Sequence, residues 1–323
     1  MTTNEDERLR DYSPGNPLVF SHIPKTAGTS LRTALVETLQ PDVLVRGVDT
    51  SLVGGYDDYE LLRGVAADFH FSPDDLDADA TLVAGHIAPG TTMVRYPGAD
   101  HITMLRNPRL RVLSQWLHCR SLSDFDLRHY GRAGTAFRLG RLPFGEYLNR
   151  SMIAPNTDNT ITRFLAWPHP LLATTEFIPQ SHDGELLDVA LARIDEFAHV
   201  GLVEDPAAQR RLGEWLGRPL PETRVNERAT RTRRRTDLAS ELDDATLERL
   251  DQRTRLDRQV WSHVARRMLP DQDPDAVLEA SWAKSIARYA GAARQKGASR
   301  PVRRAVEIAY GIGYRLDPRR DRY

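Results

Sequence analysis

Pro17-Leu-Val-Phe-Ser-His-Ile23 is a short apolar run, and Pro24-Lys-Thr-Ala-Gly-Thr-Ser30 follows it as a turn. Apolar residues then recur at positions 31, 34, 35 and 39, which is the spacing of one helix face. A buried strand, a tight loop and a helix in this order are typical of an α/β protein. This stretch therefore predicts the fold class, and it places a loop between a strand and a helix.

The rest of the chain repeats the alternation of strands and helices. Further buried strands are predicted at Thr81–Gly85, His101–Leu105 and Phe197–Val203. Helices are predicted over 109–119, 206–216 and 240–268, with a helical, arginine-rich region over 121–196. Residues 49–79 carry nine acidic side chains against one arginine, which predicts irregular surface structure. The alternation favours a mostly parallel sheet.

Composition narrows the class of protein. The chain has 323 residues, 40% of them hydrophobic, with a formal net charge of −1. That length can bury a sizeable core in one large domain or two smaller ones. No apolar run approaches the ~18 residues that span a bilayer, and the acidic N-terminus does not resemble a secretory leader. Cys119 is the only cysteine, so no internal disulfide is expected, which fits a reducing cytoplasm.

The basic residues are strongly biased toward arginine. Of the 44 basic residues only three are lysines, at positions 25, 284 and 296. A GC-rich genome would produce this bias, so it carries little functional information by itself. Lysine and arginine differ chemically, however, and Lys25 lies within the loop that follows the first strand.

The loop has the composition of an anion-binding site, because unpaired backbone N–H groups at the start of a helix attract negative charge. Thr26, Thr29 and Ser30 add hydroxyl donors, and Lys25 adds a compact positive charge. Gly28 permits an unusual φ and close approach of a ligand. A capped helix start beside an unrelated lysine would explain neither the lysine nor the hydroxyl cluster.

The order of residues in the loop argues against the common nucleotide-binding motifs. The nucleoside-triphosphatase pattern places glycine before the lysine, whereas Pro24 precedes Lys25 here. No G-x-G-x-x-G sequence follows a predicted strand. An ordinary kinase or dehydrogenase is therefore disfavoured.

Phe20-Ser-His-Ile-Pro-Lys-Thr-Ala-Gly-Thr-Ser-Leu31 resembles the 5′-phosphosulfate-binding loop of sulfotransferases that use 3′-phosphoadenosine 5′-phosphosulfate (PAPS). The branch it resembles most contains bacterial and carbohydrate sulfotransferases. The resemblance implies a P-loop-like, three-layer α/β fold with a central parallel sheet flanked by helices. It also implies that the backbone amides of Thr26, Ala27, Gly28, Thr29 and Ser30 bind the 5′-phosphosulfate. Lys25 would stabilise the leaving 5′-phosphate.

A second motif carries the same resemblance. Sulfotransferases bind the 3′-phosphate with an arginine at a strand end and a serine eight residues later, and Arg106 and Ser114 have that spacing. Physically, the arginine offers a bidentate fork for phosphate. Arg109 and Arg111 are expected to be surface charges. Weaker matches are Asn159–Leu165, Ala198–Glu204 and Leu256–Trp261, so the resemblance runs patchily from about residue 17 to 266.

A late basic segment closes over the 3′-phosphate in many sulfotransferases. Residues 221–235 hold six arginines, and Arg224 and Asn226 are the candidates for this contact. A solvated loop fits the same composition. Aromatic residues are not interleaved with the arginines there, so nucleic-acid binding is not expected.

The acceptor requires a general base, and histidine suits that role near neutral pH. His86 ends the strand Thr81–Gly85, and carboxyl ends of parallel strands are where α/β sites gather. The carbohydrate sulfotransferases that the chain resembles place a catalytic histidine at a similar point. His22 also ends a strand beside the loop, as a second candidate base or as a supporting residue. His86 could instead serve only to pair with a backbone carbonyl.

The sequence as a whole predicts a PAPS-dependent sulfotransferase, with no metal. Its domains are a flexible arm over 1–16, a sulfotransferase domain over 17–268, and a basic helical extension or tail over 269–323. The acceptor would be a hydroxyl, or less readily an amine, on a carbohydrate, glycolipid or small metabolite. A P-loop nucleotide kinase or phosphotransferase and a non-catalytic binding protein of the same fold remain as alternatives.

The expected compartment is the cytoplasm. The tail over 291–323, with a basic amphipathic segment at 300–312, could be solvated or could contact the inner membrane face.

Overall fold

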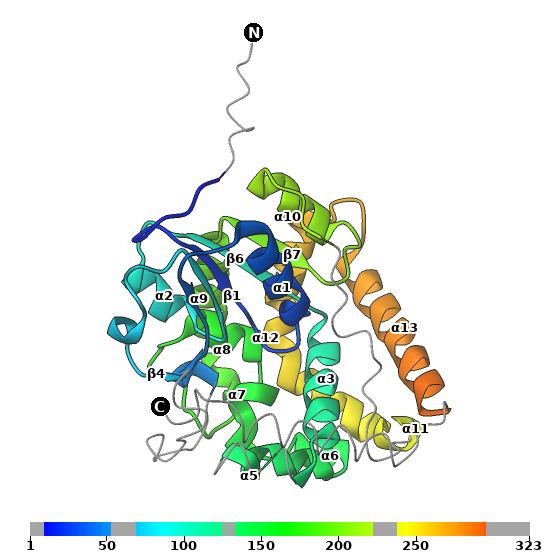
Figure 1. The fold of residues 1–323 in the computed structure, drawn as a ribbon. Coiled ribbons are helices and arrows are strands. Elements are labelled where there is room, and N and C mark those ends of the chain that lie inside the picture. Colours follow the sequence, from blue (N-terminus) through cyan, green and yellow to red (C-terminus); the bar gives the residue numbers. More distant parts are fainter. Residues whose placement is uncertain (1–9, 53–68, 125–126, 128–132, 222–237, 295–323) are drawn as a thin grey trace.

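A five-stranded parallel sheet forms the centre of the molecule (Figure 1). The computed structural model describes residues 10–52, 69–124, 127, 133–221 and 238–294. The strand order is β2-β5-β1-β6-β7, with bounds Leu44–Val45, Leu82–Gly85, Leu18–Ser21, Asp100–Leu105 and His199–Leu202. Because β1 pairs with both β5 and β6, the loop after β1 lies at the middle of the sheet's carboxyl edge.

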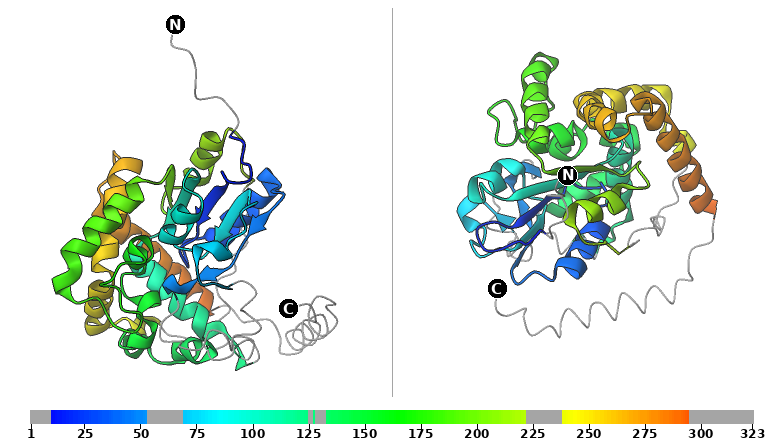
Figure 2. Two further views of the ribbon diagram at one scale, coloured as in Figure 1. Left: turned by 90° about the vertical axis from the view of Figure 1, so that its left-hand side faces the viewer. Right: turned by 90° about the horizontal axis from the view of Figure 1, so that it is seen from above.

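Helices cover both faces of this sheet (Figure 2). Leu18 and Phe20 of β1 pack with α1 (Gly28–Leu39) and α10 (Ala208–Leu216). On the other face, residues of β6 and β7 pack with α8 (Thr160–Ala166), α9 (Asp183–Asp195) and α12 (Asp244–Met268). The predicted α/β fold with a central parallel sheet flanked by helices is confirmed.

The segment 49–79 differs from the prediction. Within its described residues, Asp49 is 1% exposed, and β3 (Val48–Asp49) pairs in parallel with β4 (Phe69–His70). Leu76 is buried in a cluster with Ile87 and Tyr96, which flank α2 (Pro89–Arg95). The expectation of irregular surface structure is therefore wrong for Asp49, Phe69 and Leu76, whose side chains are buried, whereas Phe71 is 52% exposed. Residues 53–68 lie outside the described part of the chain.

The helical middle region is confirmed, and the helix after the second motif has the expected place. The remaining helices are α3 (Pro108–Ser121), α5 (Ala133–Arg138), α6 (Phe144–Tyr147), α7 (Ala154–Thr157), α11 (Leu238–Glu241) and α13 (Pro274–Arg294). Single turns of 3-10 helix occur at Thr50–Leu52, Pro73–Asp75, Leu139–Arg141, Ser151–Ile153 and Gln180–His182.

Both ends of the described chain contact the body of the molecule. Arg10, within the predicted arm, donates to Trp215 O at 3.0 Å and lies over the Trp215 ring. At the other end, Asn107 Nδ2 donates to Leu278 O of α13 at 2.8 Å. The basic loop from residue 222 to 235 and the tail segment 300–312 lie outside the described residues.

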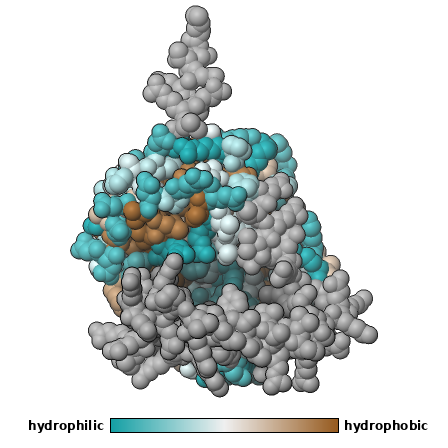
Figure 3. Space-filling model, in the orientation of Figure 1, coloured by the Kyte–Doolittle hydropathy of each residue, from teal (hydrophilic) through white to brown (hydrophobic). Residues whose placement is uncertain are grey.

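The surface is mixed in character. On the face drawn in Figure 3, hydrophilic residues surround one hydrophobic area in the upper left part. None of the described helices combines the length and the apolar character needed to cross a membrane.

Candidate functional site

The loop between β1 and α1 has an uncommon backbone. Lys25 and Ala27 have φ values of 72° and 62°, in the left-handed region that few residues other than glycine adopt. Thr26 lies between them, fully buried, and its hydroxyl donates to Ile23 O at 2.8 Å. Thr26 thus stabilises the turn from inside, and its hydroxyl is directed at the loop's own backbone. Strained turns that lead into a helix N-terminus present backbone N–H groups to anions.

Gly28 is needed for a reason that differs from the prediction. It is the first residue of α1 and does not have a positive φ, so the conformational freedom of glycine is not used there. A Cβ built on Gly28 would lie 1.9 Å from Cδ2 of His22. The close approach at this position is therefore that of the His22 ring.

Arg106 joins the second motif to the loop. It follows β6, the neighbour of β1, and its Nη1 donates to the backbone oxygen of Lys25 at 3.0 Å. The pKa of Lys25 is lowered to about 8, chiefly by burial and also by the positive charges of Arg106 and Arg111, whereas Cys119 opposes the shift. Residues far apart in the sequence thus surround one ammonium group.

Arg111 is the third cation of this group, and the expectation of a surface charge is wrong for it. Its side chain is fully buried, because position 111 lies on the inner face of α3. Nη2 donates to Asn156 O at 2.6 Å, while Nε and Nη1 have no partner. Burial lowers the pKa of Arg111 to about 10, and the charge of Asp257 opposes this.

These three cations have no directly paired anion within the described chain. In that part of the structure no carboxylate lies within 4.0 Å of the charged nitrogens of Lys25, Arg106 or Arg111. Arg109 behaves differently, because it forms ion pairs with Asp251 at 2.5 Å and Glu279 at 2.9 Å near the surface. A buried positive charge without a directly paired carboxylate is costly, so the arrangement suits a bound anion.

His86 lies at the carboxyl end of β5 with its tautomer determined by a backbone contact. Its Nδ1 is 2.5 Å from the carbonyl oxygen of His22. A carbonyl can only accept, so Nδ1 carries the proton and Nε2 of the neutral ring keeps its lone pair. The pKa of His86 is lowered to about 4, chiefly by burial. The hydrogen bond to the His22 carbonyl opposes this shift, whereas the positive charges of Lys25 and Arg32 contribute to it.

His22 supports this arrangement from inside the protein. It is 6% exposed, its ring stacks on Phe20 with centroids 5.4 Å apart, and it lies 4.3 Å from the His86 ring. Its pKa is lowered well below the ordinary value by burial, with smaller contributions from neighbouring positive groups. The geometry gives His22 an orienting position beneath His86.

Asp49 is a buried residue of this region that the sequence did not single out. Its carboxylate accepts from Ala88 N and Thr91 Oγ1, each at 2.8 Å, and burial raises its pKa. Its own N–H donates to His86 O at 3.1 Å. Asp49 therefore fixes the chain at His86 and in the residues just after it. The apolar residues 43–45 signal only the preceding strand, β2, and not the strand that contains Asp49.

The structure connects the other predicted site residues less directly with Lys25 and Arg106. Ser114 is partly exposed on α3, one turn after Leu110, and no hydrogen bond links it to Arg106 among the described residues. Thr29 and Ser30 lie in the first turn of α1, partly exposed. Arg224 and Asn226 lie outside the described residues.

The weaker sequence matches have structural roles. Asn159, with φ 47°, donates its N–H to Arg253 O at 2.6 Å and accepts from Leu256 N at 2.8 Å, which ties α8 to α12. Asp257 accepts from the N–H groups of Ile161 and Thr162 at the start of α8. Glu204 accepts from Asn107 N at 2.9 Å and Trp261 Nε1 at 3.2 Å. These contacts stabilise the frame that holds the loop.

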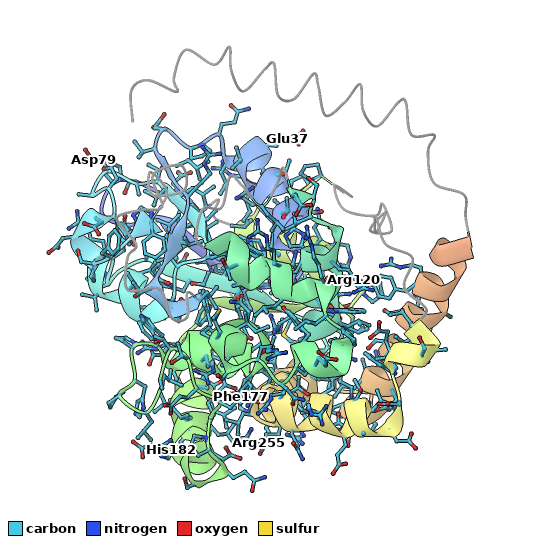
Figure 4. All side chains as sticks on the ribbon, turned by 90° about the horizontal axis from the view of Figure 1, so that it is seen from below. Glu37, Asp79, Arg120, Phe177, His182 and Arg255 are labelled. Carbon is cyan, nitrogen blue, oxygen red and sulfur yellow. The ribbon has the colours of Figure 1, made fainter. Side chains whose placement is uncertain are left out.

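A set of arginines far from the loop is also paired within the protein. Arg255 binds the carboxylate of Asp183, and the guanidinium of Arg253 lies 3.3 Å from the centre of the Phe177 ring. Figure 4 shows Arg255, Phe177 and His182 gathered at one end of the molecule, away from Arg120. Abundant arginine therefore serves mainly to stabilise the structure, in contrast with the group around Lys25.

Two cavities open beside the loop at the carboxyl edge of the sheet. One, of about 690 Å³, is lined by Arg106, Val203 and one face of α13. The other, of about 770 Å³, is lined by Ala27, Val203 and residues of α10. Each is large enough for a nucleotide-sized ligand. Neither a scan against models of known protein families nor a search of curated proteins found a match for this chain.

Proposed function

We propose that this protein is a sulfotransferase that takes the sulfuryl group of PAPS and transfers it to an acceptor hydroxyl. The hydrogen bond from Arg106 Nη1 to Lys25 O carries the proposal. It joins the two motifs that resemble the 5′-phosphosulfate and 3′-phosphate sites, although 81 residues separate them in the chain. Two anionic groups of one nucleotide would then face cations that lack paired carboxylates.

The residues fit such a nucleotide on physical grounds. The left-handed residues Lys25 and Ala27 set the backbone of an anion-binding turn, and the two unpartnered nitrogens of Arg111 are the kind of orphan groups that an anion would satisfy. PAPS would supply the sulfuryl group and a phosphate leaving group. The protein's part would be positioning and charge stabilisation, as in phosphoryl transfer.

Lys25 and His86 have distinct roles in this proposal. The Lys25 ammonium stabilises the negative charge that develops on the leaving 5′-phosphate. His86 accepts the acceptor's proton at Nε2, while the His22 carbonyl holds Nδ1. His22 is then a positioning residue. Under the same proposal, the acceptor is a carbohydrate, a glycolipid or a small metabolite.

The test is calorimetric titration of the protein with 3′-phosphoadenosine 5′-phosphate (PAP), the nucleotide product. We expect binding by the unaltered protein and at least tenfold weaker binding by Arg106→Ala, since a charge-assisted contact contributes about 1.4 kcal/mol or more. Arg109→Ala is the matched control, because Asp251 and Glu279 already engage its guanidinium. Absence of PAP binding by the unaltered protein would contradict the proposal.

The same titration, together with an assay of sulfuryl transfer, separates the two alternative functions. A nucleotide kinase predicts binding of ATP in the presence of Mg²⁺ and no preference for PAP. A non-catalytic protein of this fold predicts PAP binding without any effect of Lys25→Ala or His86→Ala on transfer, because it has no transfer to lose.

A further inference from the structure

Helix α13 presents one continuous face to the cavity of about 690 Å³. The lining positions 276, 277, 280, 281, 284, 285 and 288 recur at helical spacing. The first four are small or medium-sized residues, whereas Lys284 and Arg288 extend from the later turns. Arg106, Leu110 and Val203 line the same cavity. Figures 1 and 4 show α13 beside α12 at the edge of the molecule.

The charges around this cavity are unbalanced. Arg106, Lys284 and Arg288 are cationic, whereas the acidic lining residues are Glu204 and Asp273. Glu204 already accepts from Asn107 N and Trp261 Nε1, and Asp273 accepts from the backbone at the start of α13. Within the described chain, no carboxylate lies within 4.0 Å of the Lys284 ammonium. The cavity is therefore suited to an anionic group between Arg106 and α13.

We propose that α13 forms a wall of the nucleotide site, with Lys284 and Arg106 together holding the ribose 3′-phosphate. This inference rests on the proposed function and extends it to a helix outside the part of the chain that carries the family resemblance. Arg106 contacts the Lys25 loop through Nη1 and also lines this cavity. It thus connects the loop, where the 5′ group would lie, with the face that bears Lys284.

The experiment compares two ligands that differ only in the 3′-phosphate, PAP and adenosine 5′-monophosphate (AMP). Calorimetry with the full chain would measure both affinities for the unaltered protein and for Lys284→Ala. We expect PAP affinity to fall about tenfold and AMP affinity to change less than twofold, because one charge-assisted contact is lost with the first ligand only. Lys284 is exposed, so the substitution should leave the melting temperature unchanged.

Arg266→Ala is the control for the loss of one positive charge, since Arg266 is exposed on α12 and does not line the cavity. It should alter neither affinity by more than twofold. PAP binding that survives Lys284→Ala, or an equal loss for PAP and AMP, overturns the role of Lys284 and leaves the proposed function intact. Failure of the unaltered protein to bind PAP overturns the proposed function and this inference with it.

Discussion

The imidazole of His22 lies directly against the backbone of Gly28, so that no side chain can occupy position 28 without displacing the ring. The same ring lies 4.3 Å from His86, and the His22 carbonyl accepts from His86 Nδ1. The geometry of the loop and the orientation of the candidate base are therefore set by one residue. A change at Gly28 should affect both.

Gly28→Ala should destabilise the protein by about 1–3 kcal/mol, as overpacking of a filled interior does, and should weaken PAP binding. Gly184→Ala is the matched control, because a Cβ at Gly184 of α9 meets nothing within 4 Å. Alanine is the better helix former, so the control should be about 0.5–1 kcal/mol more stable. Chemical denaturation measures both. Equal stability of the two variants would show that the His22 ring moves freely.

PAP affinity should fall as the pH rises above about 8. Lys25 has its pKa lowered to about 8, so it loses its proton in this range in the unliganded protein, and a bound anion favours the protonated form. Well above pH 8, the affinity for PAP should fall by about tenfold per pH unit. The phosphate groups are already ionised there, since their second pKa is about 6. The pKa of the nearby Cys119 is raised to about 11, outside the window.

Lys25→Arg tests this assignment, because arginine stays protonated throughout the range. Its PAP affinity should be independent of pH between 8 and about 9, since Arg111, with its pKa lowered to about 10, begins to lose its proton above that range. The lowered pKa of Lys25 also makes a prediction for stability. The unfolded chain holds the proton that the folded chain has lost, so the free energy of unfolding of the unliganded protein should rise from about pH 8 toward 10. A pH dependence of binding that persists in Lys25→Arg would assign it to another group.

His86→Asn should lower turnover by about 10²- to 10⁴-fold, the usual contribution of a general base, with PAP affinity retained. The asparagine amide can still donate to the His22 carbonyl, so the fold should survive. His263→Asn is the control, since His263 lies on the surface beside Asp195. Because burial lowers the pKa of His86 to about 4, kcat/KM of the unaltered protein should show no acid limb near pH 6.5. Full activity of His86→Asn would exclude it as the base.

Asn159→Gly should cost about 1–3 kcal/mol of stability while leaving PAP affinity unchanged. Glycine tolerates the φ of 47°, so the substitution removes mainly the buried acceptor of the Leu256 N–H. Denaturation and calorimetry on the same samples measure the two quantities. A loss of PAP binding without a loss of stability would instead show that Asn159 takes part in ligand binding and is not only a structural residue.

The sequence predicts those parts of the fold that have strong local periodicity. Four of the five strands of the sheet occur at the predicted positions, whereas β2 is two residues long and gives no periodic signal. Helix α1 begins at Gly28, three residues before the apolar spacing that revealed it. Its first turn belongs to the loop in sequence character, because backbone geometry and not side-chain burial determines where it starts.

The site was predicted less completely, because its geometry depends on contacts across the sheet. The motif spacing identified Lys25 and Arg106, but burial of Arg111 depends on which face of α3 turns inward. The contact of His86 with His22 follows from the pairing of Ser21 with Gly85, which local sequence does not specify. Asp49 is one aspartate among many acidic neighbours, and only its partners Ala88 and Thr91 distinguish it.

The left-handed backbone at Lys25 has a consequence for how this chain can change. Glycine would adopt a φ of 72° at no steric cost, whereas lysine there costs on the order of 1 kcal/mol. Substitution of Lys25 by glycine should therefore relieve this local backbone strain. One substitution could thus relieve the backbone strain and remove the ammonium group at the same time. At this one residue, backbone strain favours glycine, whereas the proposed chemistry needs the ammonium group of lysine. Screens for thermostable variants should therefore tend to select inactive variants at position 25.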